Sequence, residues 1–356
     1  MQMVSITDLD IDQKIISCLR KGRITTIPHI LVLPNEELAA KAHITAEDVS
    51  KLREAICRKL NPQQPCSLLD IWKQTCHPSF LHTKLSAGCQ IIDDTLKGGL
   101  LVPGINEISG ESGSGKTQIA LQLCLTVQLD VQYGGLQGGA LFISTEDAFP
   151  TKRLHQLAHH MQKRLKSQNE NLMDSIYIEH AADVESLKTL VNQRIPTLLM
   201  NSNVRLIVID SIAAVFRVEY TVNENLERSK ALAELGQRLH IISHKYRVAI
   251  VCINQISDVV SADKVGSEDI GGRRVIPALG LSWANAVTVR LMVMRTPYTV
   301  SQLRGAAANS GNAQQDLTKV SSSGGSIVRK LKVLFAPHIP KNECYYLVEE
   351  HGVRGF

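Results

Sequence analysis

The sequence predicts an α/β protein in which a mostly parallel, twisted sheet is flanked by helices and extended by antiparallel C-terminal strands, after a small all-α N-terminal domain. Three observations support this prediction. Residues 10–60 have a helical pattern, short apolar runs alternate with longer helical patterns from Gly104 onward, and after Trp283 the apolar runs follow one another without helices. Alternating strands and helices are typical of a parallel sheet, and consecutive strands favour antiparallel pairing.

The composition excludes several classes of protein. A chain of 356 residues with 44% hydrophobic content can form a full-sized core in more than one domain. Its longest apolar runs, residues 206–209 and 248–253, are shorter than the roughly 18 residues of a membrane helix, so we expect no membrane partner. Eight cysteines without a C-x-x-C pair indicate reduced thiols and no zinc site. A net charge of only +5 means that any contact with DNA would be local.

The helical domain covers residues 1–60 and contains one well-defined helix start. Thr45 can cap a helix, and Asp48, three residues later, can accept the reciprocal hydrogen bond of a capping box. Ile44 and Val49 can form a hydrophobic staple. Its basic and acidic residues nearly balance, which favours packing over DNA binding as the domain's role. Pro62 and Pro65 then interrupt the helical pattern and begin a linker over residues 61–84.

The core is expected over residues 85–356. Its predicted strands are residues 104–108, 140–144, 176–179, 205–209, 248–253, 286–294, 328–335 and 343–348, and its predicted helices are residues 116–129, 150–166, 183–195 and 223–246. Residues 298–326 are rich in Ser, Ala, Asn, Gln and Gly, which predicts a disordered loop at the tip of a hairpin.

A phosphate-binding motif follows the first strand of this core. It consists of Gly110, Glu111, Ser112, Gly113, Ser114, Gly115, Lys116 and Thr117, which match G-x-x-x-x-G-K-[ST] between a strand and a helix. The glycines permit a tight turn whose amides face phosphate, and the helix dipole adds positive potential. Lys116 would hold the β- and γ-phosphates and Thr117 would ligate Mg²⁺.

Polar residues end three other buried strands. Asp210 ends the strand 205–209 and would be a second Mg²⁺ ligand, although a buried strand can also end in a structural Asp. Glu146 follows the strand 140–144 and is the candidate for polarising water, with helix capping as the alternative. Gln255 follows the strand 248–253 and could sense the γ-phosphate through its amide.

The expected nucleotide is ATP, because the chain lacks the N-K-x-D sequence with which GTPases read guanine. A small-molecule kinase is disfavoured, since no arginine-bearing lid follows the sheet. His155, His159 and His160 share a helix face but lack the glutamate of a zinc protease, so a solvated face is the simpler interpretation.

Two segments after the sheet's carboxyl edge could contact DNA. One begins at Phe216 and carries Arg217, and the other, residues 257–280, contains three glycines together with Arg273 and Arg274. A mobile surface loop is the alternative for the longer segment. That segment contains no aromatic residue to stack on bases.

Taken in order, the phrases GESGSGKTQ, FISTEDAFPTKRL, LIVIDSIAAVFR and CINQ, followed by a Gly-Gly loop, make the chain similar to the RecA-type recombinases of eukaryotes and archaea. The phrases TEDAFP, PALGLSWAN, FAPHIP and EEHGVRG are similar to one recombinase paralogue of that family. The resemblance implies a RecA-like ATPase core with ATP and Mg²⁺. It assigns Lys116, Thr117, Asp210, Glu146 and Gln255 the roles given above.

The resemblance adds roles that the residues alone do not suggest. It places Arg153 against adenine, residues 217–226 and 257–280 as two DNA loops, and residues 336–340 as a cap over a neighbour's nucleotide. It implies a factor in homologous-recombination repair of DNA double-strand breaks and in replication-fork maintenance. Such a factor would pair with a second paralogue, designated C, bind single-stranded or branched DNA and support the main recombinase. It would act in the nucleus, with a further cytoplasmic pool.

Departures from the family pattern bear on activity. Residues 66–69 lack the aromatic-x-x-Ala tether through which recombinases polymerise, and Asp147 replaces the glycine that usually follows the catalytic glutamate. We therefore expect a weak DNA-dependent ATPase that assists another recombinase. The alternatives are an autonomous ATPase that exchanges strands and a scaffold that binds ATP without hydrolysing it.

Overall fold

The structure is a computed structural model that describes Ile6 and residues 9–60, 66–73, 75–76, 81–146, 148–165, 171–220, 224–259, 267–270, 273–300 and 326–356. The chain divides into two compact units, Met1–Leu81 and His82–Phe356. The second unit therefore begins three residues before the boundary that the sequence suggests, inside the expected linker.

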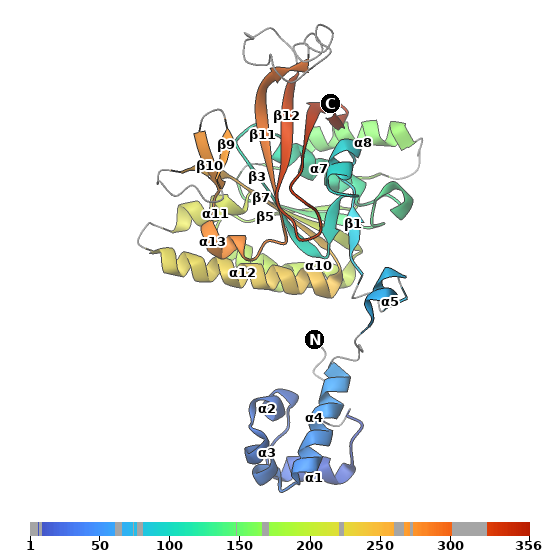
Figure 1. Cartoon of the computed structure of the whole chain (residues 1–356), viewed down its shortest axis with the longest axis vertical. Helices are drawn as coiled ribbons and strands as arrows, with labels where there is room; N and C mark the ends of the chain where they lie inside the picture. Colours follow the sequence, from blue (N-terminus) through green and yellow to red (C-terminus); the bar gives the residue numbers. More distant parts are fainter. Residues whose placement is uncertain are drawn as a thin grey trace. The chain divides into compact units, whose positions relative to one another are not determined.

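The smaller unit is built from short helices (Figure 1). They are α1 (Gln13–Lys21), α2 (Ile27–Val32), α3 (Asn35–Ala42), α4 (Ala46–Leu60) and α5 (Leu68–Trp72). Apolar residues of the first four form one buried cluster, with Leu19, Ile30, Leu38 and Leu52 fully buried. The continuous helical pattern of residues 10–60 is thus divided by turns, which let each helix face this cluster.

The capping interaction at the start of α4 has the predicted form. The Asp48 amide donates to Thr45 Oγ1 at 3.1 Å, and the Thr45 amide donates to Asp48 Oδ2 at 3.2 Å. Two backbone donors at the helix start are thereby satisfied. These hydrogen bonds lower the pKa of the Asp48 carboxyl.

The larger unit contains a nine-stranded sheet among its described residues. From one edge to the other the strands are β14 (Gly352–Gly355), β13 (Glu343–Glu349), β12 (Ile327–Phe335), β11 (Val289–Thr299), β3 (Gly104–Gly110), β7 (Ala249–Asn254), β6 (Val204–Asp210), β4 (Gly139–Ser144) and β5 (Ile176–His180). The strands from β11 to β5 are parallel, and β11 to β14 pair antiparallel. The predicted fold class is confirmed.

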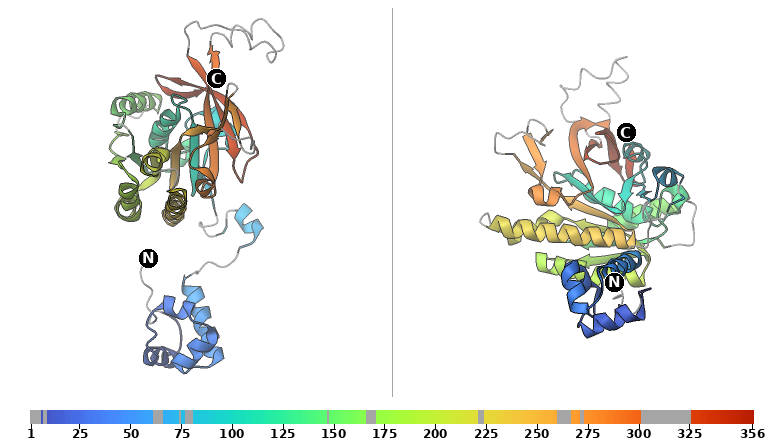
Figure 2. Two further views of the ribbon diagram at one scale, coloured as in Figure 1. Left: turned by 90° about the vertical axis from the view of Figure 1, so that its left-hand side faces the viewer. Right: turned by 60° about the horizontal axis from the view of Figure 1, so that its bottom comes forward.

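Helices cover both faces of this sheet (Figures 1 and 2). They are α6 (Gln90–Thr95), α7 (Lys116–Thr126), the 3₁₀ turn η3 (Val131–Tyr133), α8 (Thr151–Leu165), α9 (Val184–Thr189), the π-helical segment η4 (Leu190–Arg194), α10 (Ile195–Asn201), α11 (Ile212–Glu219), α12 (Asn225–Tyr246) and α13 (Gly280–Ala284). Strand β6 shows the two faces, since Leu206 and Val208 pack with α7 and α8 while Ile207 and Ile209 pack with α9 to α13.

Several elements differ from the sequence prediction. A two-stranded antiparallel sheet of β1 (Thr83–Leu85) and β2 (Leu100–Val102), with α6 between them in the chain, precedes the main sheet. The strands β8 (Ile256–Asp258), β10 (Arg273–Pro277) and β9 (Glu268–Ile270) form a small antiparallel sheet where a loop was expected. The predicted helix 183–195 continues through η4 to Asn201. The expected hairpin of β11 and β12 is present, and of the predicted disordered loop 298–326, residues 301–325 lie outside the described residues.

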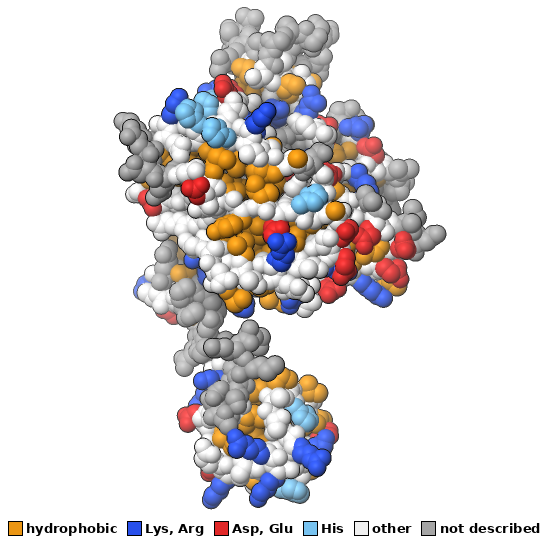
Figure 3. Space-filling model, turned by 180° about the vertical axis from the view of Figure 1, so that it is seen from behind, with side chains coloured by type: hydrophobic (Ala, Val, Ile, Leu, Met, Phe, Trp, Pro, Cys, Tyr) orange, Lys and Arg blue, Asp and Glu red, His pale blue; other side chains and the backbone are white. Residues whose placement is uncertain are grey.

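The surface of the larger unit carries apolar as well as charged side chains. Figure 3 shows hydrophobic side chains gathered across one face, with acidic side chains at its flank. Exposed apolar residues include Tyr177 and Ile178 of the edge strand β5. Across the described ranges, we find no helix with both the length and the apolar character needed to span a lipid bilayer.

Candidate functional site

The phosphate-binding turn lies between β3 and α7, as the motif requires. A Cβ on Gly110 would lie 2.2 Å from the Val293 carbonyl oxygen, so the close approach of the two strands requires glycine. Gly113 and Gly115 have φ of 72° and 102°, in the left-handed region that other residues rarely adopt. These glycines let the chain turn sharply and start α7 at Lys116.

A cavity of about 590 Å³ opens over this turn. It brings together ten residues of the predicted site: Gly110, Glu111, Ser112, Gly113, Gly115, Lys116, Thr117, Glu146, Asp210 and Gln255. Gln118, which directly follows the motif, also lines it. Ser211, Ile256, Arg329 and Val348 complete its lining. Ser114, the remaining motif residue, is fully buried beneath the turn.

Lys116 is held at the floor of the cavity. Its Nζ donates to the carbonyl oxygens of Gly110 and Glu111, both at 2.8 Å. Burial lowers the pKa of the Lys116 ammonium, and the carboxylates of Asp210, Glu146 and Glu111 oppose this shift. A partly desolvated ammonium beside a phosphate-sized space is suited to binding an anion.

Thr117 and Asp210 form the candidate metal site. Thr117 Oγ1 donates to Asp210 Oδ2 at 2.8 Å, across 93 residues of sequence. Burial raises the pKa of the Asp210 carboxyl, while the hydrogen bond from Thr117 and the charge of Lys116 oppose the shift. A hydroxyl and a carboxylate side by side supply the oxygen ligands that Mg²⁺ prefers, so these residues fit the ion.

Glu146 and Gln255 meet at the other side of the cavity. Gln255 Nε2 donates to Glu146 Oε1 at 2.7 Å, although 109 residues separate them. Strands β4 and β7 end at the same edge of the sheet, which explains why the two side chains converge. Asp147, the departure next to Glu146, lies outside the described residues.

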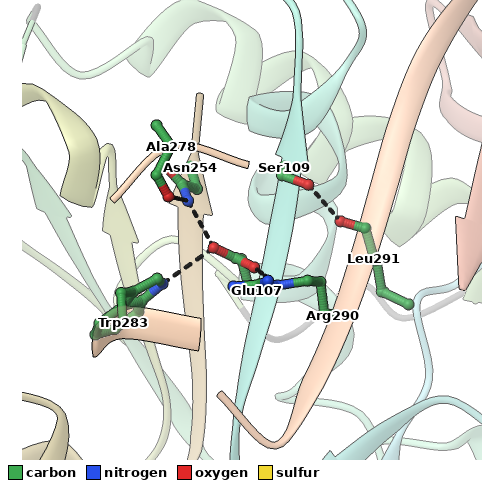
Figure 4. Close-up of polar contacts among 7 residues, drawn as sticks. All are labelled: Glu107, Ser109, Asn254, Ala278, Trp283, Arg290 and Leu291. Atoms are coloured by element: carbon green, nitrogen blue, oxygen red, sulfur yellow. Dashed lines mark hydrogen bonds and ion pairs between the residues drawn. The ribbon is translucent and has the colours of Figure 1, made fainter. Parts of the chain in front are cut away.

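A buried polar cluster supports the strands below the cavity (Figure 4). Glu107 of β3 is fully buried and forms an ion pair with Arg290 of β11. Asn254 Nδ2 and Trp283 Nε1 also donate to Glu107 Oε1, at 2.6 and 3.0 Å. Burial raises the pKa of the Glu107 carboxyl, and Arg290 with the two neutral donors opposes the shift.

The same cluster reaches both ends of the segment that follows β7. Asn254 Nδ2 donates to the Ala278 carbonyl oxygen at 2.9 Å, and the Ala278 amide donates to the Gln255 carbonyl oxygen at 2.8 Å. Asn254 is fully buried, so its side-chain amide is held in place between Glu107 and the Ala278 carbonyl group. Residues 255 and 278 are therefore held together beside Glu107.

Arg153 does not line the cavity in the structure. Its guanidinium donates to the carbonyl oxygens of Glu349 and Glu350, at 2.6 and 2.7 Å, and its Nε donates to Gln118 Oε1 at 2.7 Å. Gln118 does line the cavity. Arg153 thus anchors the turn between β13 and β14 beside the site, and its contact with adenine stays a prediction.

The three arginines predicted to bind DNA lie in regular elements. Arg217 is in α11 and lines a second cavity of about 510 Å³, together with Phe216, Tyr220 and Arg228. Arg273 and Arg274 lie in β10, whereas the sequence suggested a loop there. Part of each predicted DNA segment, residues 221–223, 260–266 and 271–272, lies outside the described residues.

Sequence reasoning missed three residues that the C-terminal strands bring to the site. Arg329 and Val348 line the cavity from β12 and β13, and Tyr346 Oη donates to the Ser114 carbonyl oxygen at 2.9 Å. All three side chains pack against Gly115, since a Cβ added at this residue would lie 3.3 Å from an atom of each. No local motif identifies them, because the antiparallel strands bring them to the turn from more than 200 residues away.

The fold and the site together define a RecA-like protein with a phosphate-binding loop. The Rad51 family model matches residues 81–299, and the chain belongs to this family. DNA repair protein XRCC3 of Mus musculus is 38% identical over 360 residues, covering 99% of this chain and 98% of that protein.

Two further relatives extend the comparison. XRCC3 of Bos taurus is 35% identical over 354 residues, covering 98% of this chain and 96% of that protein. DNA repair protein rhp57 of Schizosaccharomyces pombe is 31% identical over 316 residues, covering 80% of this chain and 86% of that protein. The phrases TEDAFP, PALGLSWAN and EEHGVRG are likewise similar to the paralogue called X-ray repair cross-complementing protein three.

Proposed function

We propose that the chain is an ATP-binding recombinase paralogue of homologous-recombination repair, which supports the filament of another recombinase. One observation carries the proposal. The cavity over the phosphate-binding turn collects Lys116, the Thr117–Asp210 pair and the Glu146–Gln255 pair, which come from four strand ends. An ATPase site needs a cation that binds phosphate, ligands for the metal ion and a residue that orients water, all within one cavity.

The residues would divide the work as follows. Lys116 and the amides of the turn would bind the phosphates, and Thr117 and Asp210 would hold Mg²⁺. Bound Mg²⁺ would neutralise charge on the transferred phosphoryl group. Glu146 would orient and polarise a water molecule, while Gln255 would respond to the γ-phosphate and pass the signal to the segment ending at Ala278. Slow hydrolysis would then release the DNA-binding state.

The proposal includes a heterodimer with the paralogue designated C. The relatives are DNA repair proteins, which supports a role in repair. Strand β5 is a sheet edge with exposed Tyr177 and Ile178, and an apolar cavity of about 490 Å³ lies between it and α10. An uncovered edge with apolar side chains favours association with another chain. Single-stranded and branched DNA are the proposed ligands, and the nucleus is the proposed location.

An assisting role is favoured over autonomous strand exchange. Residues 66–69 lack the aromatic-x-x-Ala tether, and Ser67 instead caps the short helix α5 through a hydrogen bond with Asp70. Because this segment forms a helix start and lacks the aromatic and alanine anchors, it is poorly suited to linking copies of the chain into a polymer.

The test is co-purification with candidate paralogues, followed by DNA binding with and without ATP. We expect a stable pair whose affinity for single-stranded or branched DNA rises with ATP. Glu146→Gln should keep this ATP effect and lower hydrolysis. Turnover by the isolated chain at the rate of a true recombinase would contradict the assisting role. Partner binding and nucleotide retention both unchanged in Lys116→Ala would instead favour a scaffold.

A further inference from the structure

Arg329 occupies a position in the nucleotide cavity that the phosphate-binding motif does not include. It lies on β12, and its Cδ is one of three atoms that a Cβ on Gly115 would approach at 3.3 Å. The side chain therefore packs against the phosphate-binding turn. Arg329 also lines the nucleotide cavity, together with Val348.

The charge of Arg329 has no carboxylate partner among the described residues. Its Nη1 donates to the Ile327 carbonyl oxygen at 3.1 Å, and its Nε is buried without a hydrogen-bond partner. A buried donor left unsatisfied is unfavourable, and a bound ligand is one kind of partner that would satisfy it.

Neither residue paired with Arg329 in the sheet offers a carboxylate. Arg295 of β11 is directly opposite on one side, and Tyr346 of β13 is opposite on the other. Like charges opposite one another destabilise a sheet. Burial lowers the pKa of the Arg329 guanidinium, and Arg295 lowers it further. Two cations thus flank a turn that is itself built to attract anions.

We propose that Arg329 binds the phosphate groups of a nucleoside polyphosphate as a second cation from the same chain, alongside Lys116. Phosphate oxygens accept hydrogen bonds from a guanidinium in a fixed, forked geometry, and would satisfy the donors that the protein leaves free. The inference rests on the proposed nucleotide site and deepens it, because it assigns part of the phosphate recognition to the C-terminal hairpin.

The main test measures ATP, ADP and adenosine binding to the full chain by calorimetry. Arg329→Gln should weaken ATP and ADP binding roughly ten- to hundredfold, the range expected for a lost hydrogen bond to a charged group, and leave adenosine unchanged. Arg194→Gln at the end of η4 is the matched control, because Arg194 pairs with Glu179 at the surface away from this cavity.

The outcomes separate this inference from the proposed function. If the unaltered chain does not bind ATP, the proposed function fails. If it binds ATP and Arg329→Gln binds ATP equally well, only the inference is overturned. Arg329→Lys keeps the charge but not the forked geometry, so we expect its ATP affinity to lie between that of the unaltered chain and that of Arg329→Gln.

A second measurement uses the unaltered protein, so that it does not depend on the folding of a variant. Phenylglyoxal modification is mapped by mass spectrometry with and without saturating ATP. We expect Arg329 to react in free protein and to be protected by ATP, while Arg194 reacts equally in both. An Arg329 that does not react, or reacts equally with ATP present, would overturn the inference.

Discussion

Two arginines on neighbouring strands of the sheet have opposite surroundings. Arg290 of β11 is 18% exposed and faces the buried carboxylate of Glu107, with Asn254 and Trp283 completing the cluster. Arg329 of β12 faces Arg295 and the neutral phenol of Tyr346. The first arginine is neutralised within the protein and serves the fold. The second is left positive beside the phosphate-binding turn, which suits a ligand that brings its own negative charge.

Breaking the neutralised pair should have the largest effect. Glu107→Ala leaves Arg290 charged and buried, and leaves the donors of Asn254 and Trp283 without their acceptor. Removing one partner of a buried pair costs about 3–5 kcal/mol of the free energy of unfolding. Urea unfolding monitored by circular dichroism would measure it.

Two controls sharpen this prediction. Glu343→Ala removes the partner of Lys330 from a more exposed ion pair and should cost at most about 1 kcal/mol. The double change Glu107→Leu and Arg290→Met removes both charges and should recover most of the lost stability. A double variant no more stable than Glu107→Ala would show that the polar cluster itself, and not its charge balance, maintains the fold.

Lys116→Ala should have the next largest effect, on ligand binding. It removes the ammonium at the floor of the cavity, and we expect ATP affinity to fall by roughly a hundredfold or more. Lys163→Ala on the exposed face of α8 is the matched control. Equal ATP affinity in the two variants, measured by calorimetry, would exclude Lys116 from the site.

Tyr346→Phe should have an intermediate effect on stability. The change leaves the Ser114 carbonyl oxygen without the donor that the structure gives it at 2.9 Å. An unsatisfied buried acceptor costs about 1–2 kcal/mol in the free energy of unfolding. Thermal unfolding would detect it, and an unchanged midpoint would mean that water replaces the phenol.

The smallest effect on stability is expected for Arg329→Met. The charge has no carboxylate partner in the described structure, so its removal should change the free energy of unfolding by at most about 1 kcal/mol. The aliphatic part of methionine can keep the packing against Gly115. A loss as large as that of Glu107→Ala would erase the distinction between the two arginines.

The sequence predicts the cavity well because its main residues follow local rules. Asp210 ends one buried parallel strand and Gln255 directly follows another, and the carboxyl ends of such strands meet at one edge of the sheet. Lys116 lies in a motif whose flanking strand and helix are visible from hydrophobic periodicity. These positions can be predicted without knowing how distant strands pair.

The two arginines could not be predicted in this way. The pairing of Arg290 with Glu107 depends on a register between β3 and β11 that joins residues 183 positions apart. Arg329 reaches the turn only because β12 follows β11 back along the sheet. The small sheet that contains Arg273 was missed for a related reason, since its strands are three to five residues long and partly polar.

The most direct test of the account is calorimetric titration of the full chain with ATP and Mg²⁺, alone and with its paralogue partner. We predict saturable binding at one site per chain at or below millimolar ATP, weakened roughly a hundredfold or more by Lys116→Ala and retained by Lys163→Ala. An absence of binding at millimolar ATP and Mg²⁺ in both forms would contradict the proposed nucleotide site.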